Sequence, residues 1–113
     1  MELTQEQIIG FNRWMAATVR GNKVLTKASD SYIGLIVLEE NKLTVNLEHL
    51  SPEYQEKFIL KNFDDYCKKF ITFLKRTIVR FFELEQIEFH TFNFIFILDG
   101  RKFEKFVTII TPS

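Results

Sequence analysis

Hydrophobic residues near the start of the chain recur at intervals of three and four, which is the spacing of one helix face. The pattern is carried by Ile8, Phe11, Met15 and Val19. Thr4 is suited to the N-cap position, and Gln7 three residues later completes a capping box. Gly21 provides a C-terminal stop, because glycine adopts the left-handed conformation at little cost. The sequence therefore predicts a helix over residues 4–20.

Three short strands are predicted next, and the first of them covers residues 24–27. Residues 32–38 are apolar at nearly every position, which is typical of a central strand covered on both faces. Residues 43–48 alternate apolar with polar side chains, so this strand buries one face only. A polar turn at 39–42 separates the last two strands, and Asn41 is the residue there that tolerates the left-handed conformation.

Pro52 opens a long region that contains neither glycine nor proline until Gly100 and is predicted to be helical. One unbroken helix through this region would span about 50 Å at the rise of an α-helix. A domain of this size has a radius of gyration of only ~13 Å. Asn62 is a candidate second N-cap. We therefore favour a short helix at 52–61 and a main helix at 63–84, and the alternative is a single helix.

The apolar residues of the 63–84 helix cover about half of its circumference, more than the ~100° stripe of an ordinary surface helix. This width predicts that the helix lies deep across a sheet. Its opposite side carries five basic residues with no acidic residue among them: Lys68, Lys69, Lys75, Arg76 and Arg80. Such a face binds phosphates or an acidic segment of a partner protein. The alternative is a solvated face whose charge is balanced by the glutamates that follow.

Phenylalanine, of which the chain has thirteen, is concentrated in a predicted hairpin over residues 89–110. The two-residue loop Asp99-Gly100 is a strong signal for a type I′ turn, and it fixes the strand register. One face then pairs Leu98 with Arg101, Phe96 with Phe103, Phe94 with Lys105 and Phe92 with Val107. The other face pairs Ile97 with Lys102, Ile95 with Glu104, Asn93 with Phe106 and Phe89 with Ile110. The first face is aromatic and is predicted to point into the core.

The second face of the hairpin is mixed rather than polar. Its apolar residues are Ile95, Ile97, Phe106 and Ile110. They would form an apolar patch in water unless another element covers them. The helix at 4–20 is the only other element large enough, but its apolar stripe is narrow and Trp14 lies to the side of it. If that helix packs on this face the patch is core, and if not, the sheet dimerises or accepts a ligand segment.

These elements predict a single α+β domain over residues 1–113, with an antiparallel sheet of about five strands and the long helix packed on one face. The predicted order is α-β-β-β-α-β-β. This order resembles that of the small type III secretion chaperones of class I, which dimerise and wrap an extended effector segment. The resemblance implies a protein-binding homodimer. The chain differs from those chaperones in being neutral where they are acidic.

Composition adds few constraints on function. Fifteen basic residues balance fifteen acidic ones, so global charge favours neither nucleic acid nor an anionic membrane. The single cysteine, Cys67, is typical of a reducing compartment. The first residues lack the basic start and apolar core of a signal peptide, and no apolar run approaches the ~20 residues of a membrane span. We therefore expect a soluble, cytoplasmic protein without a membrane partner.

No set of residues in the sequence points to catalysis or to a cofactor. His49 and His90 have no second histidine or cysteine at ligand spacing, so we expect no metal site and interpret both as rim residues with a polar tip in water. Cys67 lies on the apolar side of the main helix and is interpreted as a core residue. The paired carboxylates are scattered over a turn and two helix ends, and no glycine-rich phosphate loop is present.

We therefore expect a non-enzymatic module that binds a protein segment or a second copy of itself, with no cofactor. The residues expected to bind the partner by apolar burial are Trp14, Ile95, Ile97, Phe106 and Ile110. Lys75, Arg76 and Arg80 are expected to form an electrostatic rim. The alternative is a nucleic-acid-associated protein that uses the basic face of the 63–84 helix, whose binding would weaken steeply with salt.

Overall fold

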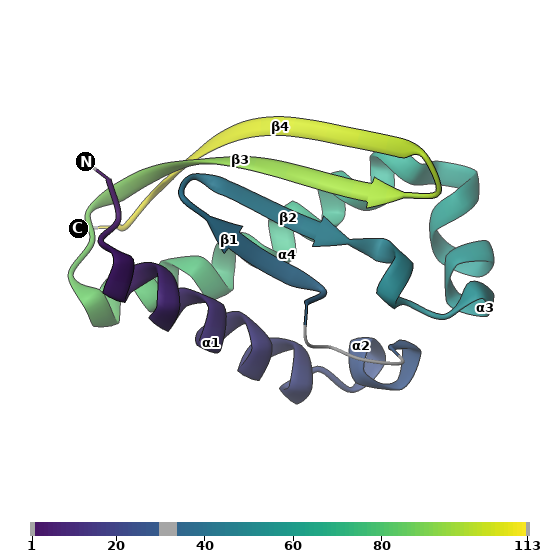
Figure 1. Ribbon diagram of the computed structural model, residues 1–113, viewed down its shortest axis with the longest axis horizontal. Coiled ribbons are helices and arrows are strands. Elements are labelled where there is room, and N and C mark those ends of the chain that lie inside the picture. Colours follow the sequence, from purple (N-terminus) through teal and green to yellow (C-terminus); the bar gives the residue numbers. More distant parts are fainter. Residues whose placement is uncertain (1, 30–33, 113) are drawn as a thin grey trace.

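A sheet forms one layer of the molecule and the helices form the other (Figure 1). The computed structural model describes residues 2–29 and 34–112. Its helices are α1 (Gln5–Gly21), α2 (Lys23–Ala28), α3 (Pro52–Tyr54) and α4 (Phe63–Glu85), with short non-α helical turns at Leu47–His49, Gln55–Ile59 and Leu60–Asn62. Its strands are β1 (Ile36–Glu39), β2 (Lys42–Asn46), β3 (Phe89–Leu98) and β4 (Arg101–Ile110). Among the described residues, no helix is long and apolar enough to cross a membrane.

The predicted first helix is confirmed, together with its capping box. The Gln7 backbone N–H donates to the Thr4 hydroxyl at 3.1 Å, and the Thr4 backbone N–H donates to the Gln7 side chain at 2.9 Å. The first four backbone N–H groups of an α-helix have no partner within the helix, and the capping box satisfies two of them. Three residues of the predicted apolar stripe are buried: Phe11, Met15 and Val19.

The strand predicted at residues 24–27 is wrong, because this segment belongs to helix α2. The Asn22 side chain accepts a hydrogen bond from the Leu25 backbone N–H at 3.0 Å and so caps the helix. Leu25 and Ala28, one turn apart, are both buried. The described chain thus has an additional helix where a strand was expected, and the element order that carried the resemblance to secretion chaperones is not the order found.

The sheet order is β1-β2-β3-β4. The two hairpins are antiparallel, but β2 and β3 run parallel, so the prediction of a purely antiparallel sheet of five strands is wrong. The physical reason is the long connection through α4, which returns the chain to the end of the sheet where β2 began. The segment predicted as a central strand at 32–38 contributes an edge strand, β1, from residue 36 onward, and residues 30–33 lie outside the described part.

The register predicted for the last hairpin is confirmed at every pair. Asp99 and Gly100 have φ values of 47° and 79°, as a type I′ turn requires. In the β1–β2 turn the prediction was less accurate, because Glu40 rather than Asn41 takes the left-handed conformation, with φ of 54°. A two-residue loop fixes the pairing of both flanking strands, so the alternation of faces follows along all ten residues of each.

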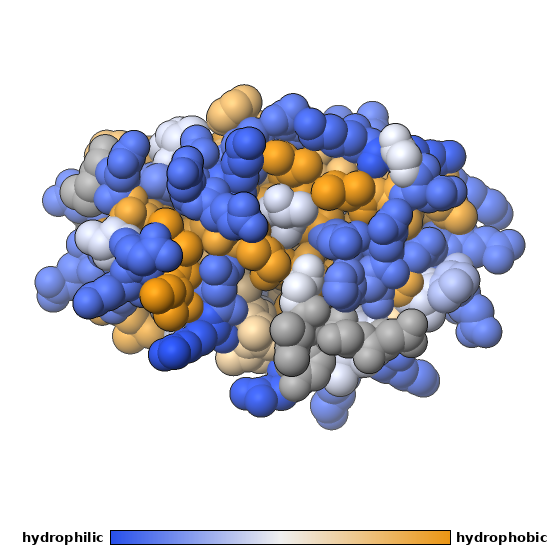
Figure 2. Space-filling view, in the orientation of Figure 1, coloured by the Kyte–Doolittle hydropathy of each residue, from blue (hydrophilic) through white to orange (hydrophobic). Residues whose placement is uncertain are grey.

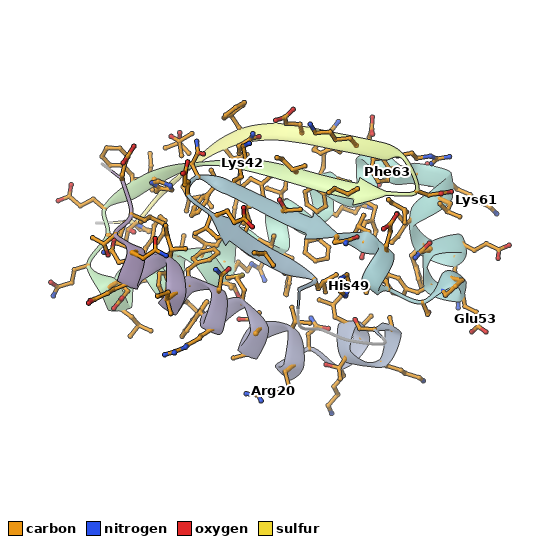
Figure 3. The ribbon with its side chains drawn as sticks, in the orientation of Figure 1. Arg20, Lys42, His49, Glu53, Lys61 and Phe63 are labelled. Atoms are coloured by element: carbon orange, nitrogen blue, oxygen red, sulfur yellow. The ribbon has the colours of Figure 1, made fainter. Side chains whose placement is uncertain are left out.

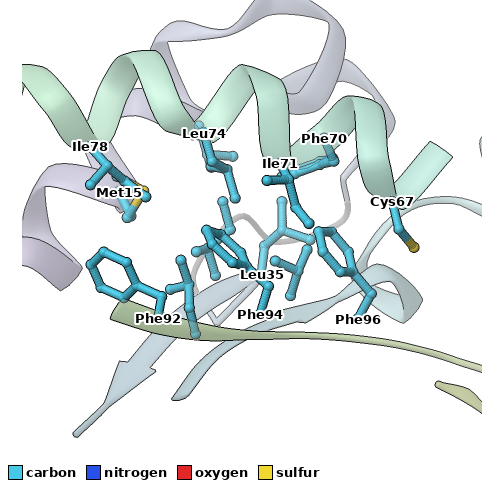
Figure 4. Packing of buried hydrophobic residues seen from close by; sticks show 14 of the residues in the cluster. Met15, Leu35, Cys67, Phe70, Ile71, Leu74, Ile78, Phe92, Phe94 and Phe96 are labelled. Atoms are coloured by element: carbon cyan, nitrogen blue, oxygen red, sulfur yellow. The ribbon is translucent and has the colours of Figure 1, made fainter. Parts of the chain in front are cut away.

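Both long helices pack on the same face of the sheet. The apolar side of α4 faces the phenylalanines of β3, and Met15 of α1 closes one end of this core (Figure 4). The rings of Phe11 in α1 and Phe92 in β3 lie 5.5 Å apart. The open question about the helix at 4–20 is thus answered, because α1 lies beside α4 and does not cover the second face of the sheet.

The predicted division of residues 52–84 is also observed. The chain passes from α3 through a π-helical and a 3₁₀ turn before α4 begins at Phe63. Asn62 takes the N-cap position with a non-helical backbone, but its side chain makes no capping hydrogen bond.

Candidate protein-binding surface

The face of the sheet opposite the helices, which we call the open face, is covered by none of the described elements (Figure 1). Side chains alternate along the strands, so every second residue of β3 and β4 points to it. Exposed fractions there reach 64% for Phe106, 67% for Ile110, 44% for Phe89 and 37% for Ile97. Figure 2 shows apolar surface among polar side chains over the strands. We call Phe89, Ile95, Ile97, Phe106 and Ile110 the apolar patch.

A polar network lies in the middle of the apolar patch. The Asn93 side-chain amide donates to Glu104 at 2.7 Å, and Lys102 forms an ion pair with Glu104 at 3.7 Å. The hydrogen bond from Asn93 and the positive charge of Lys102 lower the pKa of the Glu104 carboxyl, and Lys42 at the start of β2 contributes (Figure 3). Glu104 therefore carries its negative charge at the exposed surface of the open face, beside the apolar patch.

Asn93 has an acceptor that the described part of the chain does not use. Its side chain is only 5% exposed, yet its Oδ1 has no hydrogen-bond partner among the described residues. A buried amide oxygen without a donor is costly, and such exceptions are few in folded proteins. The sequence analysis missed this residue. The signal for it was a polar side chain between Phe92 and Phe94, diagonal to Glu104 in the hairpin register.

Trp14, expected to bind the partner together with the residues of the apolar patch, does not lie on the open face. Its indole N–H donates to the Thr77 carbonyl of α4 at 3.0 Å, and its ring lies 6.0 Å from that of Phe81. Trp14 lies beside the apolar stripe of α1, and this side of α1 faces α4. Trp14 therefore joins α1 to α4 within the helical layer.

The basic residues of α4 are exposed as predicted, but they do not surround the apolar patch. Lys75, Arg76 and Arg80 project from the helix layer, whereas the patch lies on the opposite surface of the sheet. They therefore cannot act as its electrostatic rim. Lys69 is paired with Asp65 one turn earlier, at 3.1 Å, so part of this basic surface is neutralised locally.

A shallow depression of about 710 Å³ extends the basic surface beyond α4. It lies where the start of α4 meets the β3–β4 turn, and Figure 3 places Lys61 and Phe63 there. The Arg101 guanidinium donates to the Leu60 carbonyl at 3.0 Å and joins the two segments. The charged residues that line the depression are Lys61, Lys68, Arg101 and Lys102 together with Asp64 and Asp65.

Neither cysteine chemistry nor a metal cluster is evident in the described residues. Cys67 is fully buried, as predicted, and burial raises the pKa of its thiol to about 12. His90 is buried against the ring of Phe92 at 4.8 Å, so its interpretation as a rim residue with a polar tip in water is wrong. No group of three histidine, cysteine or carboxylate side chains within 2–29 and 34–112 is placed to hold a metal ion.

No family model, curated protein or solved structure matches this chain. The features that bear on function are therefore the open face with its apolar patch and the basic surface around α4.

Proposed function

We propose that this protein is a non-enzymatic binding module that acts as a homodimer and holds a segment of a partner protein against the open face. The observation that carries this proposal is the placement of both α1 and α4 on one face of the sheet. A sheet in a two-layer domain normally buries its apolar side and keeps the other side polar. Here the other side carries the apolar patch, and large exposed apolar surfaces are typical of interaction sites.

The size of the patch suits a modest protein interface. The apolar patch offers on the order of 400 Å² of accessible apolar surface, judged from typical side-chain areas. A standard interface takes about 800 Å² from each partner, so the polar residues around the patch would supply the remainder. Burial of each large apolar side chain contributes about 1.5–3 kcal/mol before association costs.

The polar network would select among apolar segments. The exposed carboxylate of Glu104 favours a segment that carries a positive charge. The expected ligand is thus an extended stretch of protein with apolar side chains and at least one basic residue.

A photo-crosslinking amino acid at Ile97 is expected to trap a partner protein in cells, and the same group at Phe58 is not. Ile97 lies on the open face, whereas Phe58 is an equally suitable control because it is apolar, 52% exposed and remote from the sheet. The measurement is the appearance of a cross-linked band of defined mass in a gel.

The substitution Ile95→Lys should remove that band without unfolding the protein. Lysine at this position faces Glu104 across the strands and so gains an ion-pair partner. It also places a charge inside the patch. Equal bands from Ile97 and Phe58, or a band that survives Ile95→Lys in a folded variant, would refute the proposal.

The second candidate is a nucleic-acid-associated protein, and the observation that favours it is the exposed basic side of α4, which the depression at the start of that helix extends. Under this candidate, retention on DNA weakens steeply between low and moderate salt, because phosphate contacts release counterions. Charge reversal by Lys75→Glu with Arg76→Glu should weaken binding at least about tenfold, whereas Lys42→Glu on the sheet should not. If retention on DNA changed neither with salt nor with the double charge reversal, this function would be excluded.

A further inference from the structure

The outer edge of β4 is unpaired in the described chain. β4 is the last strand of the sheet, and seven of its ten residues are exposed. The Asn93 backbone N–H donates to the Asn41 carbonyl on the β2 side, so Asn93 and Phe106 form a pair without mutual hydrogen bonds. Hydrogen-bonded and non-bonded pairs alternate in an antiparallel ladder. The backbone groups of Phe106, Thr108 and Ile110 therefore point outward, away from β3.

The opposite edge of the sheet is protected. The side-chain amide of Asn12 in α1 donates to the Leu38 carbonyl at 3.1 Å and accepts from the Leu38 N–H at 2.7 Å. These two bonds satisfy the outward-facing backbone groups of Leu38, in the manner of a neighbouring strand. β1 is also short, at four residues. Short strands and covering side chains are the usual protection of a sheet edge.

The two halves of β4 differ in how they protect their edge. Residues 101–105 carry four charges in five positions, and charged side chains discourage strand addition. Residues 106–110, with the sequence FVTII, carry no charge and no proline. The strand ends directly afterwards at Ile110, and Pro112 has no backbone N–H to offer a further strand. The unprotected part of the edge is thus limited to five residues.

We propose that a second copy of this chain pairs with residues 106–110 of β4, antiparallel and centred on Thr108. In this register Thr108 faces Thr108 of the other copy, and Phe106 faces Ile110. The three opposed pairs of outward residues exchange about six backbone hydrogen bonds. The result is one continuous sheet through both copies.

A second copy of the chain is the expected partner of the β4 edge, because residues 106–110 are complementary to themselves in this register. Within the hairpin Ile110 already pairs with Phe89 of β3, and the new pairs of Phe106 with Ile110 are of the same aromatic and β-branched kind. Registers centred on the charged half place like charges opposite each other, such as Glu104 on Glu104 or Lys105 on Lys105. The chain has a formal net charge of zero, so no long-range repulsion opposes self-association.

This inference rests on the proposed homodimer and names its interface. Pairing at the β4 edge leaves both open faces free and on the same side of the joined sheet. The apolar patches of the two copies become neighbours, which doubles the length of surface available to an extended partner segment.

The test is the molar mass in solution over a concentration series, for wild type, Thr108→Pro and Thr108→Ala. Wild type and Thr108→Ala are expected to dimerise alike, whereas Thr108→Pro should raise the dissociation constant by about tenfold or more, since proline removes an edge donor. Both variants lose the 2.7 Å hydroxyl bond to Thr91, so they differ only in the backbone. The Thr108 N–H points outward, so proline removes no hydrogen bond within the chain.

Cysteine cross-linking tests the register independently of folding stability. Opposed residues at Thr108 would have Cα atoms about 5.5 Å apart, which a disulfide can span. Thr108→Cys should therefore form an inter-chain disulfide on mild oxidation. Thr91→Cys, its neighbour on the same face, should not, because the two copies of Thr91 would be three strand spacings, or about 14 Å, apart.

A wild type that stays monomeric, a Thr108→Pro variant that dimerises like wild type, or equal cross-linking at both positions would each overturn the edge interface. None of these results bears on the crosslink from Ile97 to a partner protein, so the failure of the interface and the failure of the binding function can be told apart.

Discussion

Replacing Phe92 by alanine is expected to lower the free energy of unfolding by about 3–5 kcal/mol, the usual cost of a large cavity in a packed core. The Phe92 ring is fully buried and lies 5.5 Å from Phe11 in α1 and 5.9 Å from Phe82 in α4. It thus joins the sheet to both long helices. A domain of this kind is stable by only about 5–15 kcal/mol in total, so the variant should be close to unfolding. Urea denaturation followed by circular dichroism gives the difference.

Phe106→Ala is the matched control for Phe92→Ala. It removes the same side chain from the neighbouring strand of the same hairpin, but the Phe106 ring lies on the open face and is 64% exposed. The expected loss is below about 1 kcal/mol when measured at a protein concentration low enough to keep the chain monomeric. Similar losses for the two variants would contradict the assignment of the two faces.

Cys67 is expected to react with iodoacetamide at least about a thousandfold more slowly in the folded protein than in urea. The reactive species is the thiolate. Burial raises the pKa of this thiol from its ordinary value of 9.0 to about 12, with a smaller contribution from the charge of Asp64. At pH 8 this shift lowers the thiolate fraction by about three orders of magnitude. Mass spectrometry of samples quenched over time gives both rates.

The control for Cys67 is the variant Thr72→Cys, which places a second thiol on the exposed side of the same helix. That thiol should react at the unfolded rate, and rates within tenfold for the two thiols would contradict the burial of Cys67. The same raised pKa makes stability depend on alkaline pH. The protonated thiol stabilises the folded state fully below pH 9, and this contribution is lost as the pH rises towards 12.

Elements set by local chemistry could be predicted from the sequence. The capping box of Thr4 and Gln7 determines where α1 begins, and both groups lie within one helical turn. The Asp99-Gly100 turn determines the pairing of twenty strand residues, because a two-residue loop allows only one register. The four apolar residues predicted to share one face of the hairpin do share it.

Elements set by contacts distant in sequence could not be predicted. The parallel pairing of β2 with β3 joins segments separated by the whole of α4, and no local signal encodes it. Residues 24–27 alternate β-branched with unbranched side chains, a short pattern compatible with either a strand or a helix, and the Asn22 cap favours the helix.

The candidate site was predicted only in part for the same reason. The position of Trp14 between α1 and α4 could not be predicted, because a helical wheel of α1 alone does not show α4 beside it. The basic residues of α4 were correctly placed on its exposed side, but their distance from the patch depends on which layer lies between them. The sequence shows Asn93 as a polar residue diagonal to Glu104, but the burial of its amide oxygen without a donor depends on the packing around it.

The bond pair between Asn12 and Leu38 limits how far any assembly of this protein can grow. A subunit whose sheet has two unpaired edges can add further subunits at both edges and so form fibres. In the described part of the chain, β4 offers an unpaired sheet edge, whereas at the β1 edge the side chain of Asn12 occupies the backbone of Leu38. We therefore infer that Asn12 protects against polymerisation, because pairing through the β4 edge ends after a single addition.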